Sequence, residues 1–440
     1  MVSFVNKTKD QVTLNKSIYL AQIIWDSGGD IIYNNGKFWQ WGGQIYNKID
    51  DIDWMIEMTR RFPALDESTP RQQNEIREVY KRFSKVSSEE FNKDDGLCFL
   101  NKYLDLKTLK ALDHDYRRIN TVLLPYDYDD KAACPLWLKT TDEIFEGNIN
   151  NKKILQEFFG YCLTKYTRHM KALFMIGEGN TGKSTVLEAL NMIVGDENTS
   201  FLSPRYYKDS FRLAEIENKL VLMCHEIPKR VEDYESEFRQ IVSGQTLDVN
   251  GKYIKPFKIK PFCKVVWAMN ELPRIDDHSS AFFNRVLPVE FNRIFQEHEQ
   301  DKDLPYKLKA ELPGILNWAV EGLKSLRERG VFLKDAYMKA HIEEMRLANN
   351  PIATWAKENI VVKKGDELIK ADVYQKYHLW CGTNGHKPTS SSKFAADFFK
   401  IFRKSTNKFS RQTTGYERKY VWPNLAWLSS QIEAQEEWAE

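Results

Sequence analysis

The residues with the clearest chemical potential lie in the stretch GEGNTGKS at positions 177–184. It has the Walker A pattern G-x-x-x-x-G-K-[ST], whose glycines let backbone N–H groups turn inward around a polyphosphate. Lys183 would reach the β- and γ-phosphates, and the Ser184 hydroxyl would ligate Mg²⁺. The pattern therefore predicts a site for ATP and Mg²⁺. The expected nucleotide-binding residues are Gly177, Glu178, Gly179, Asn180, Thr181, Gly182, Lys183, Ser184 and Thr185.

A strand and a helix are expected on the two sides of this loop. Residues 172–176, ALFMI, have the unbroken apolar character of a buried strand, and residues 185–193 repeat apolar side chains at helical spacing. Such a helix would direct the positive end of its dipole at the phosphates. A chance match in a glycine turn is the alternative, but it would not come with both flanks. The context favours a functional phosphate loop.

Two further apolar strands each end in a polar residue. Residues 219–224 lead to His225 and Glu226, and that carboxylate could hold Mg²⁺ through water or polarise an attacking water. Residues 263–269 lead to Asn270, whose amide could bind the γ-phosphate without adding negative charge. Many buried strands end in a carboxylate by chance, so Glu226 is a weaker signal than the phosphate loop. Ser184 and Glu226 are the expected metal ligands.

An arginine and a hairpin complete the set of chemical candidates. Arg285 precedes the apolar run 286–289, where it could form a surface salt bridge or reach a nucleotide bound by a neighbouring subunit. Asn250-Gly251, between two β-type runs, predicts a hairpin turn. Lys252 and Tyr253 at its tip, with Lys255 behind, would suit a groove that follows single-stranded DNA. An ordinary solvated hairpin is the alternative.

The order of these motifs within residues 177–285 resembles that of superfamily 3 helicases. Segments such as CPLWL at 134–138, NELPRI at 270–275 and LPGILNWA at 312–319 are similar to the phage and plasmid primase-helicase family, which includes the poxvirus primase-helicase. The resemblance covers residues 96–345 best. Replication initiator-helicases of staphylococcal mobile genetic islands are the nearest relatives it suggests.

The resemblance implies an ATP hydrolase that acts as a replicative DNA helicase at the origin of a phage, plasmid or mobile island. It implies an AAA+-like P-loop fold, a hexameric ring, and catalytic roles for Lys183, Glu226, Asn270 and, from the next subunit, Arg285. Lys252 and Tyr253 match the hairpin tip that contacts DNA.

The second motif departs from the family pattern. Many members carry adjacent acids there, whereas this chain has His225-Glu226-Ile227, so the general base is Glu226 itself or a nearby acid such as Glu232 or Asp233. Residues 1–95 contain no acidic cluster of primase type, so primase activity is not expected.

The expected fold class is an α/β motor with a central, mostly parallel sheet, flanked by an α+β N-terminal domain and a C-terminal winged-helix-like domain. Aromatic residues in the N-terminal strands could stack on bases, but a small core is the favoured interpretation. The predicted division is an N-terminal accessory domain, a segment leading into the motor, the ATPase core, a helical extension, a DNA-binding domain and an acidic tail, at residues 1–95, 96–168, 169–300, 301–350, 351–427 and 428–440.

The C-terminal domain carries a local excess of positive charge. Residues 384–420 contain nine Lys or Arg but only two acids, although the whole chain has a net charge of only +2. Such a concentration favours contacts to duplex phosphates, with a solvated basic face as the alternative. The candidate residues are Lys393, Lys400, Arg403, Lys404, Lys408 and Arg411.

The composition, with 42% hydrophobic and 29% charged residues, is ordinary for a soluble globular protein. We expect a cytoplasmic protein with neither a signal peptide nor a membrane-spanning segment. The six cysteines have no paired spacing, which argues against a zinc site. Expected partners are single-stranded and duplex DNA, further copies of the chain, and replication proteins that contact the N-terminal domain. Three alternatives stay open: an ATP-regulated origin-binding initiator without translocation, a small-molecule phosphotransferase, and a loop that only packs.

Overall fold

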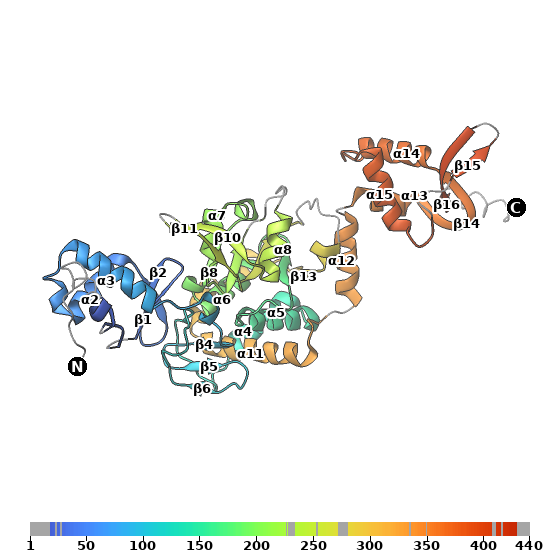
Figure 1. The fold of residues 1–440 in the computed structure, drawn as a ribbon. Coiled ribbons are helices and arrows are strands. Elements are labelled where there is room, and N and C mark those ends of the chain that lie inside the picture. Colours follow the sequence, from blue (N-terminus) through green and yellow to red (C-terminus); the bar gives the residue numbers. More distant parts are fainter. Residues whose placement is uncertain are drawn as a thin grey trace. The chain divides into compact units, whose positions relative to one another are not determined.

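The computed structural model describes residues 18–22, 24–26, 29–225, 227, 234–251, 254–271, 280–333, 336–348, 350–406, 411–414 and 417–428 (Figure 1). The chain forms two compact units. The first combines Met1–Pro273 with Asn284–Asp335, and the second combines Arg274–Phe283 with Ala336–Glu440. The boundary between residues 335 and 336 falls inside the predicted helical extension, and the six-part division of the chain stays a prediction.

A five-stranded parallel sheet forms the core of the first unit, in the order β13-β7-β12-β9-β8. This arrangement confirms the α/β core that the sequence predicts. Its central strands are buried on both faces, which explains their continuous apolar sequences. The strands are β7 (Ala172–Ile176), β8 (Thr199–Phe201), β9 (Val221–Cys224), β12 (Lys264–Met269) and β13 (Val286–Glu290).

The strand register decides which chain segments meet. Ile176 lies beside Met269, and Cys224 lies beside Trp267, so the residues that follow β7, β9 and β12 gather at one edge of the sheet. Val286 lies beside Ala172 at the opposite edge. The residue before β13 therefore starts at the far edge from the phosphate loop.

Helices cover this sheet and extend the unit. Helices α5 and α11 pack closely at Gly160, where an added Cβ would overlap the carbonyl oxygen of Ala319. Pro135 occupies the first turn of α4, where its missing N–H costs no hydrogen bond. The helices are α4 (Pro135–Phe145), α5 (Ile149–Cys162), α6 (Lys183–Val194), α7 (Ser210–Leu213), α8 (Glu235–Ser243), α10 (Leu304–Lys309) and α11 (Leu312–Arg329).

An antiparallel sheet of β1 (Ile31–Asn34), β2 (Lys37–Trp41) and β3 (Tyr46–Ile49) precedes α2 (Asp51–Arg61) and α3 (Pro70–Phe83). Asn35 and Gly36 join β1 to β2 with φ angles of 47° and 78°, the positive values that a two-residue Asn-Gly hairpin turn requires. The Phe38 and Trp54 rings stack with centroids 5.0 Å apart, and both are fully buried. These aromatic side chains form a core, which is the interpretation that the sequence favoured over stacking on nucleic-acid bases.

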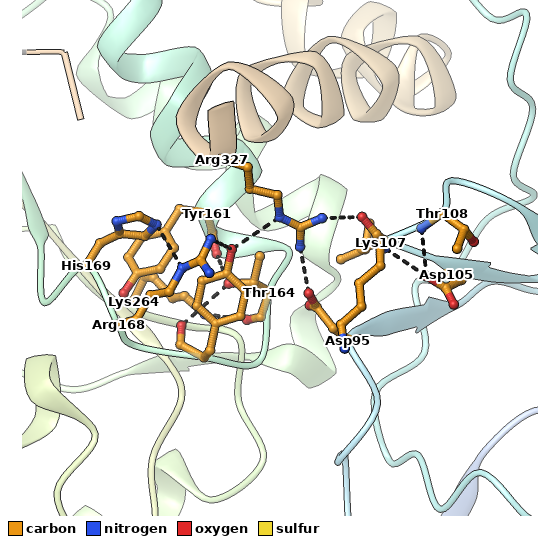
Figure 2. Close-up of polar contacts among 12 residues, drawn as sticks. Asp95, Asp105, Lys107, Thr108, Tyr161, Thr164, Arg168, His169, Lys264 and Arg327 are labelled. Carbon is orange, nitrogen blue, oxygen red and sulfur yellow. Dashed lines mark hydrogen bonds and ion pairs between the residues drawn. The ribbon is translucent and has the colours of Figure 1, made fainter. Parts of the chain in front are cut away.

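Arg327 near the end of α11 ties a second small sheet to the motor (Figure 2). Its Nη2 lies 2.6 Å from the Asp95 carboxylate, and its Nη1 donates to the carbonyl of Leu106. Two residues further along, Arg329 pairs with the buried Glu157 of α5 at 2.7 Å. The sheet held in this way consists of β4 (Gly96–Cys98), β5 (Tyr103–Asp105) and β6 (Ala111–Leu112).

The second unit has its own core, in which Trp355 and Trp422 are almost completely buried among aromatic residues. The Ser390 hydroxyl caps α15 by accepting from the Lys393 backbone N–H, as expected for a serine at this position. Its antiparallel sheet has the order β14-β16-β15. The elements are α9 (Ser280–Phe283), α12 (Ala336–Ala348), α13 (Pro351–Asn359), β14 (Ile360–Ile369), α14 (Lys370–Thr383), α15 (Ser391–Phe402), β15 (Arg411–Thr414) and β16 (Glu417–Trp427).

Candidate nucleotide-binding site

The glycine loop has a backbone path that its sequence makes possible. Asn180 and Gly182 adopt left-handed φ angles of 59° and 87° between the end of β7 and the start of α6. A Cβ at Gly182 would lie 2.8 Å from a side-chain carbon of Ile144, and one at Gly177 would overlap the carbonyl oxygen of Phe291. Both positions therefore require glycine, and the resulting loop is a close-packed cradle of backbone groups.

The ammonium of Lys183 lies over this loop. Its Nζ donates to the carbonyls of Gly177 at 2.6 Å and Glu178 at 2.5 Å, and to the Thr181 hydroxyl at 3.2 Å. Burial lowers the pKa of Lys183 below its ordinary value. The ammonium is thus held against the loop that leads into α6, and the N-terminal end of such a helix favours an anion. The neighbouring Ser184 is exposed.

A cavity of about 990 Å³ opens above the loop. Its lining includes all residues from Gly179 to Thr185, together with His225 after β9 and Asn270 after β12. The parallel strands bring these residues together, since all three segments follow carboxyl ends at the same edge of the sheet. The volume is large enough for a nucleotide.

Two walls of the cavity were not predicted from the sequence. One is formed by α4, including Thr140 and Ile144, and the other by the segment from Phe295 to Leu304. Arg293 connects them: it donates to the Glu143 carbonyl at 3.2 Å, pairs with Glu299 at 2.8 Å and stacks over the Phe295 ring at 4.4 Å. No sequence pattern identifies these walls, because α4 precedes the loop by about forty residues and meets it only through tertiary packing.

Several predicted site residues lie outside the described residues. They are Glu226, its alternatives Glu232 and Asp233, the hairpin residues Lys252 and Tyr253, and Lys408. The neighbours of Glu226, His225 and Ile227, both line the cavity. The chain therefore reaches the cavity on each side of that acid.

Arg285 is not part of the cavity of its own chain. Its carbonyl accepts a hydrogen bond from Ala172 N–H at 2.8 Å, at the sheet edge opposite the loop. Its guanidinium donates to the Ser243 hydroxyl, from Nε at 3.2 Å and from Nη2 at 3.1 Å. Of the four predicted catalytic residues, the structure thus brings Lys183 and Asn270 together and places Arg285 elsewhere.

The predicted hairpin is present, but its turn is not at Asn250-Gly251. Both residues belong to β10 (Leu247–Gly251), which pairs with β11 (Ile254–Ile259), and Gly251 lies opposite Ile254. The prediction of the turn position was wrong, because Asn250 donates to the Ser210 hydroxyl at 2.7 Å and is held within the strand beside α7. Lys255 is exposed on β11.

The basic candidates of the second unit lie along α15 and beyond it. Lys393, Lys400, Arg403 and Lys404 are exposed, and Lys400 forms an ion pair with Asp397 at 2.8 Å. Arg411 is the first residue of β15. The structure thus places four of these side chains at the surface around one helix.

The described parts of the chain contain no group of three or more His, Cys, Asp or Glu side chains placed to hold a metal ion. No described helix has the length and hydrophobicity to cross a membrane.

Three family profiles match successive parts of the chain. Residues 15–146 match "D5 N terminal like", residues 175–285 match a "Family of unknown function (DUF5906)", and residues 347–424 match "Poxvirus D5 protein-like". The resemblance to phage and viral primase-helicases is confirmed. Its extension to staphylococcal mobile islands stays a prediction.

Individual relatives agree with this family resemblance. "Putative helicase V13" of Sputnik virophage is 27% identical over 156 residues, which are 32% of this chain and 20% of that protein. The chain thus spans one fifth of the length of this curated relative. Two apo structures of the NrS-1 C-terminal region each superpose with a TM-score of 0.52 at 12% identity, covering 93% of this chain and 99% of theirs. At this identity, the likeness concerns the fold.

Proposed function

We propose that this chain is an ATP-dependent DNA helicase of superfamily 3 that separates strands at the origin of a phage, plasmid or mobile genetic island. The observation that carries this proposal is the shared cavity, which the glycine loop, Lys183 and Asn270 line at one edge of a parallel sheet. The primase-helicase family profiles and the named virophage helicase support the choice of DNA as substrate.

The residues of the loop fit a nucleoside triphosphate. Glycine at positions 177 and 182 lets the loop pack against Phe291 and Ile144, which fixes the backbone that would enclose phosphates, and Lys183 holds its ammonium against the same loop. Bound ATP with Mg²⁺ would supply the phosphoryl group and a counter-charge for its transfer. Ser184 and Glu226 would hold the metal, Glu226 would also orient the attacking water, and the Asn270 amide would report on the γ-phosphate.

The position of Arg285 supports a site shared between subunits. It starts a strand at the edge opposite the loop of its own chain, so any nucleotide it reaches belongs to another copy. We propose a ring, most simply a hexamer, in which Arg285 stabilises the charge that develops on the neighbour's phosphates. The hairpin β10–β11, with Lys252, Tyr253 and Lys255, would follow a single strand in the channel.

The remaining parts of the chain are assigned from their charge and topology. The β15–β16 hairpin packs on β14 beside α13, α14 and α15, which supports a winged-helix-like domain. The exposed basic side chains of Lys393, Lys400, Arg403 and Lys404 would contact duplex phosphates at an origin. The N-terminal domain would contribute to loading or bind replication proteins, in the cytoplasm.

Strand displacement on a forked duplex tests this function. Wild-type protein with ATP and Mg²⁺ should release the labelled strand, and Lys183→Ala should lower both ATP hydrolysis and displacement by about 100-fold because the phosphate charge loses its partner. Lys131→Ala, which removes an exposed lysine, is the matched control and should leave both rates unchanged.

Two results would contradict the proposal. Hydrolysis without displacement on forks of either tail polarity would instead indicate an ATP-regulated initiator. Hydrolysis that DNA does not stimulate would favour a phosphotransferase.

A further inference from the structure

Lys37 of the N-terminal sheet contacts two parts of the motor at once. Its Nζ lies 2.7 Å from the Glu217 carboxylate, and only 15% and 18% of the two side chains are exposed. The same ammonium lies 4.9 Å from the centroid of the Phe257 ring. Glu217 is 180 residues further along the chain, so these are tertiary contacts between separately formed elements.

The Glu217 contact lies directly upstream of β9. Asn218 has a left-handed φ of 61°, which makes a sharp turn before that strand. Asn92 also grips this turn: its Nδ2 donates to Asn218 Oδ1 at 3.1 Å, and its own side chain is fixed by the backbone and hydroxyl of Thr121. Strand β9 then leads to His225 in the cavity wall. Residues of the N-terminal half thus hold the start of the strand whose end reaches the nucleotide site.

The Phe257 contact lies on the hairpin. Phe257 belongs to β11 and pairs with the fully buried Val249 of β10. On β10, the other strand of the hairpin, Asn250 follows Val249 and donates to the hydroxyl of Ser210 in α7 at 2.7 Å. A displacement of the hairpin would therefore move Phe257 and change its contact with the Lys37 ammonium above its ring.

Energetics favour a link rather than a chance contact. An ion pair that is mostly shielded from water loses much more than a surface pair when one partner is removed, because the other charge is left buried. A cation near an aromatic face adds a further attraction. Lys48 lies close to the same pair: burial, and secondarily the charge of Lys37, lower the pKa of Lys48, whereas the charge of Glu217 raises it.

We infer that Lys37 is a positioning residue that couples the β10–β11 hairpin, the proposed DNA contact, to strand β9 and so to the nucleotide cavity. The inference rests on the proposed helicase function and gives the N-terminal sheet a part in it. DNA on the hairpin and nucleotide at the loop would each favour the arrangement in which Lys37 joins Phe257 and Glu217. Linkage then requires each ligand to raise the affinity for the other.

The test compares DNA-free and DNA-stimulated ATP hydrolysis in the full chain. Lys37→Met removes the charge but keeps the length of the side chain, and should leave the DNA-free rate within about twofold while oligo(dT) stimulation falls about fivefold. Lys37→Arg keeps both contacts and should restore stimulation. Lys93→Met, which removes an exposed ion pair with Glu90, is the matched control and should behave as wild type.

A binding measurement gives the reciprocal readout. A nonhydrolysable ATP analogue should tighten fluorescent oligo(dT) binding in the wild type, and Lys37→Met should lose about the same fivefold factor. If Lys37→Met does not fold, Glu217→Gln makes the same test from the other side of the pair.

The two levels of the argument fail differently. Stimulation retained in Lys37→Met, or lost only in proportion to the DNA-free rate, would overturn this inference alone. A wild type that DNA does not stimulate at all would overturn the proposed function and the inference with it.

Discussion

At the scale of residues, the phosphate loop shows how a pattern of types becomes geometry. Gly182 is needed because it begins α6 from a left-handed conformation against Ile144, whereas Gly179 has ordinary φ and open space around it. The same motif therefore contains two glycines that the fold requires, at positions 177 and 182, and a third at position 179 where a side chain would meet open space.

This difference predicts unequal effects of the same substitution. Gly182→Ala should lower the free energy of unfolding by about 1–3 kcal/mol, since an alanine is strained at this φ and its Cβ would press on Ile144. Gly179→Ala should change it by less than about 0.5 kcal/mol. Urea denaturation without nucleotide measures both. Equal losses would show that the loop is not held as described.

The location of a candidate residue could be predicted from the sequence where a chemical motif coincides with a strand or helix pattern. The positions of Lys183 and Asn270 at one cavity follow from a loop and strand that sequence patterns identify. Arg293 could not be found in this way, because its importance comes from contacts with Glu143, Phe295 and Glu299 across two walls. Nothing in its immediate sequence distinguishes it from a surface arginine.

At the scale of elements, strand and helix patterns were informative, whereas turns and edge strands were less so. The strands that end at Ile176, Cys224 and Met269 were predicted from continuous apolar runs. Strand β14 was missed, because IVVKKGDELI contains a central charged stretch and a glycine with φ of 93°. The predicted turn at Asn250-Gly251 is part of a strand instead, because a tertiary hydrogen bond from Asn250 to Ser210 outweighs the local turn preference.

Strand β12 begins with a buried charge that makes its stability depend on pH. Lys264 is 1% exposed, donates to the carbonyls of Thr164 and Phe262, and lies over the Tyr161 ring (Figure 2). Burial lowers the pKa of Lys264 to about 8. Between this value and its ordinary 10.5, the unfolded chain binds more protons than the folded chain, so stability from this group rises with pH.

Comparison with Lys264→Met isolates this effect. The unfolding free energy of the wild type, relative to Lys264→Met, should increase by about 2 kcal/mol between about pH 7.5 and 9.5. Lys260→Met, at an exposed lysine nearby, should show no such change relative to the wild type. Denaturant titrations at both pH values measure it. A relative stability that is flat or falls with pH would contradict the burial of a protonated Lys264.

At the scale of the whole molecule, the sequence predicts the order of parts better than their connections. The α/β core and the family resemblance follow from motifs and their spacing. Three sets of contacts could not be predicted, because they join residues more than a hundred positions apart in the chain. They are the hydrogen bond of Arg293 that connects the two cavity walls, the contacts of Lys37 and the ion pair of Arg327 with Asp95. Assembly is a further level, and Arg285 is the residue through which the proposed ring becomes testable.

A mixture of two inactive variants tests the central claim, a nucleotide site shared between copies of the chain, most directly. Lys183→Ala and Arg285→Ala should each lose nearly all ATP hydrolysis in the presence of single-stranded DNA. Subunits that exchange at random would form about one interface in four with both an intact Lys183 and an intact Arg285, so the mixture should regain up to about a quarter of the wild-type rate. A mixture no more active than the sum of the two variants alone would contradict a shared site.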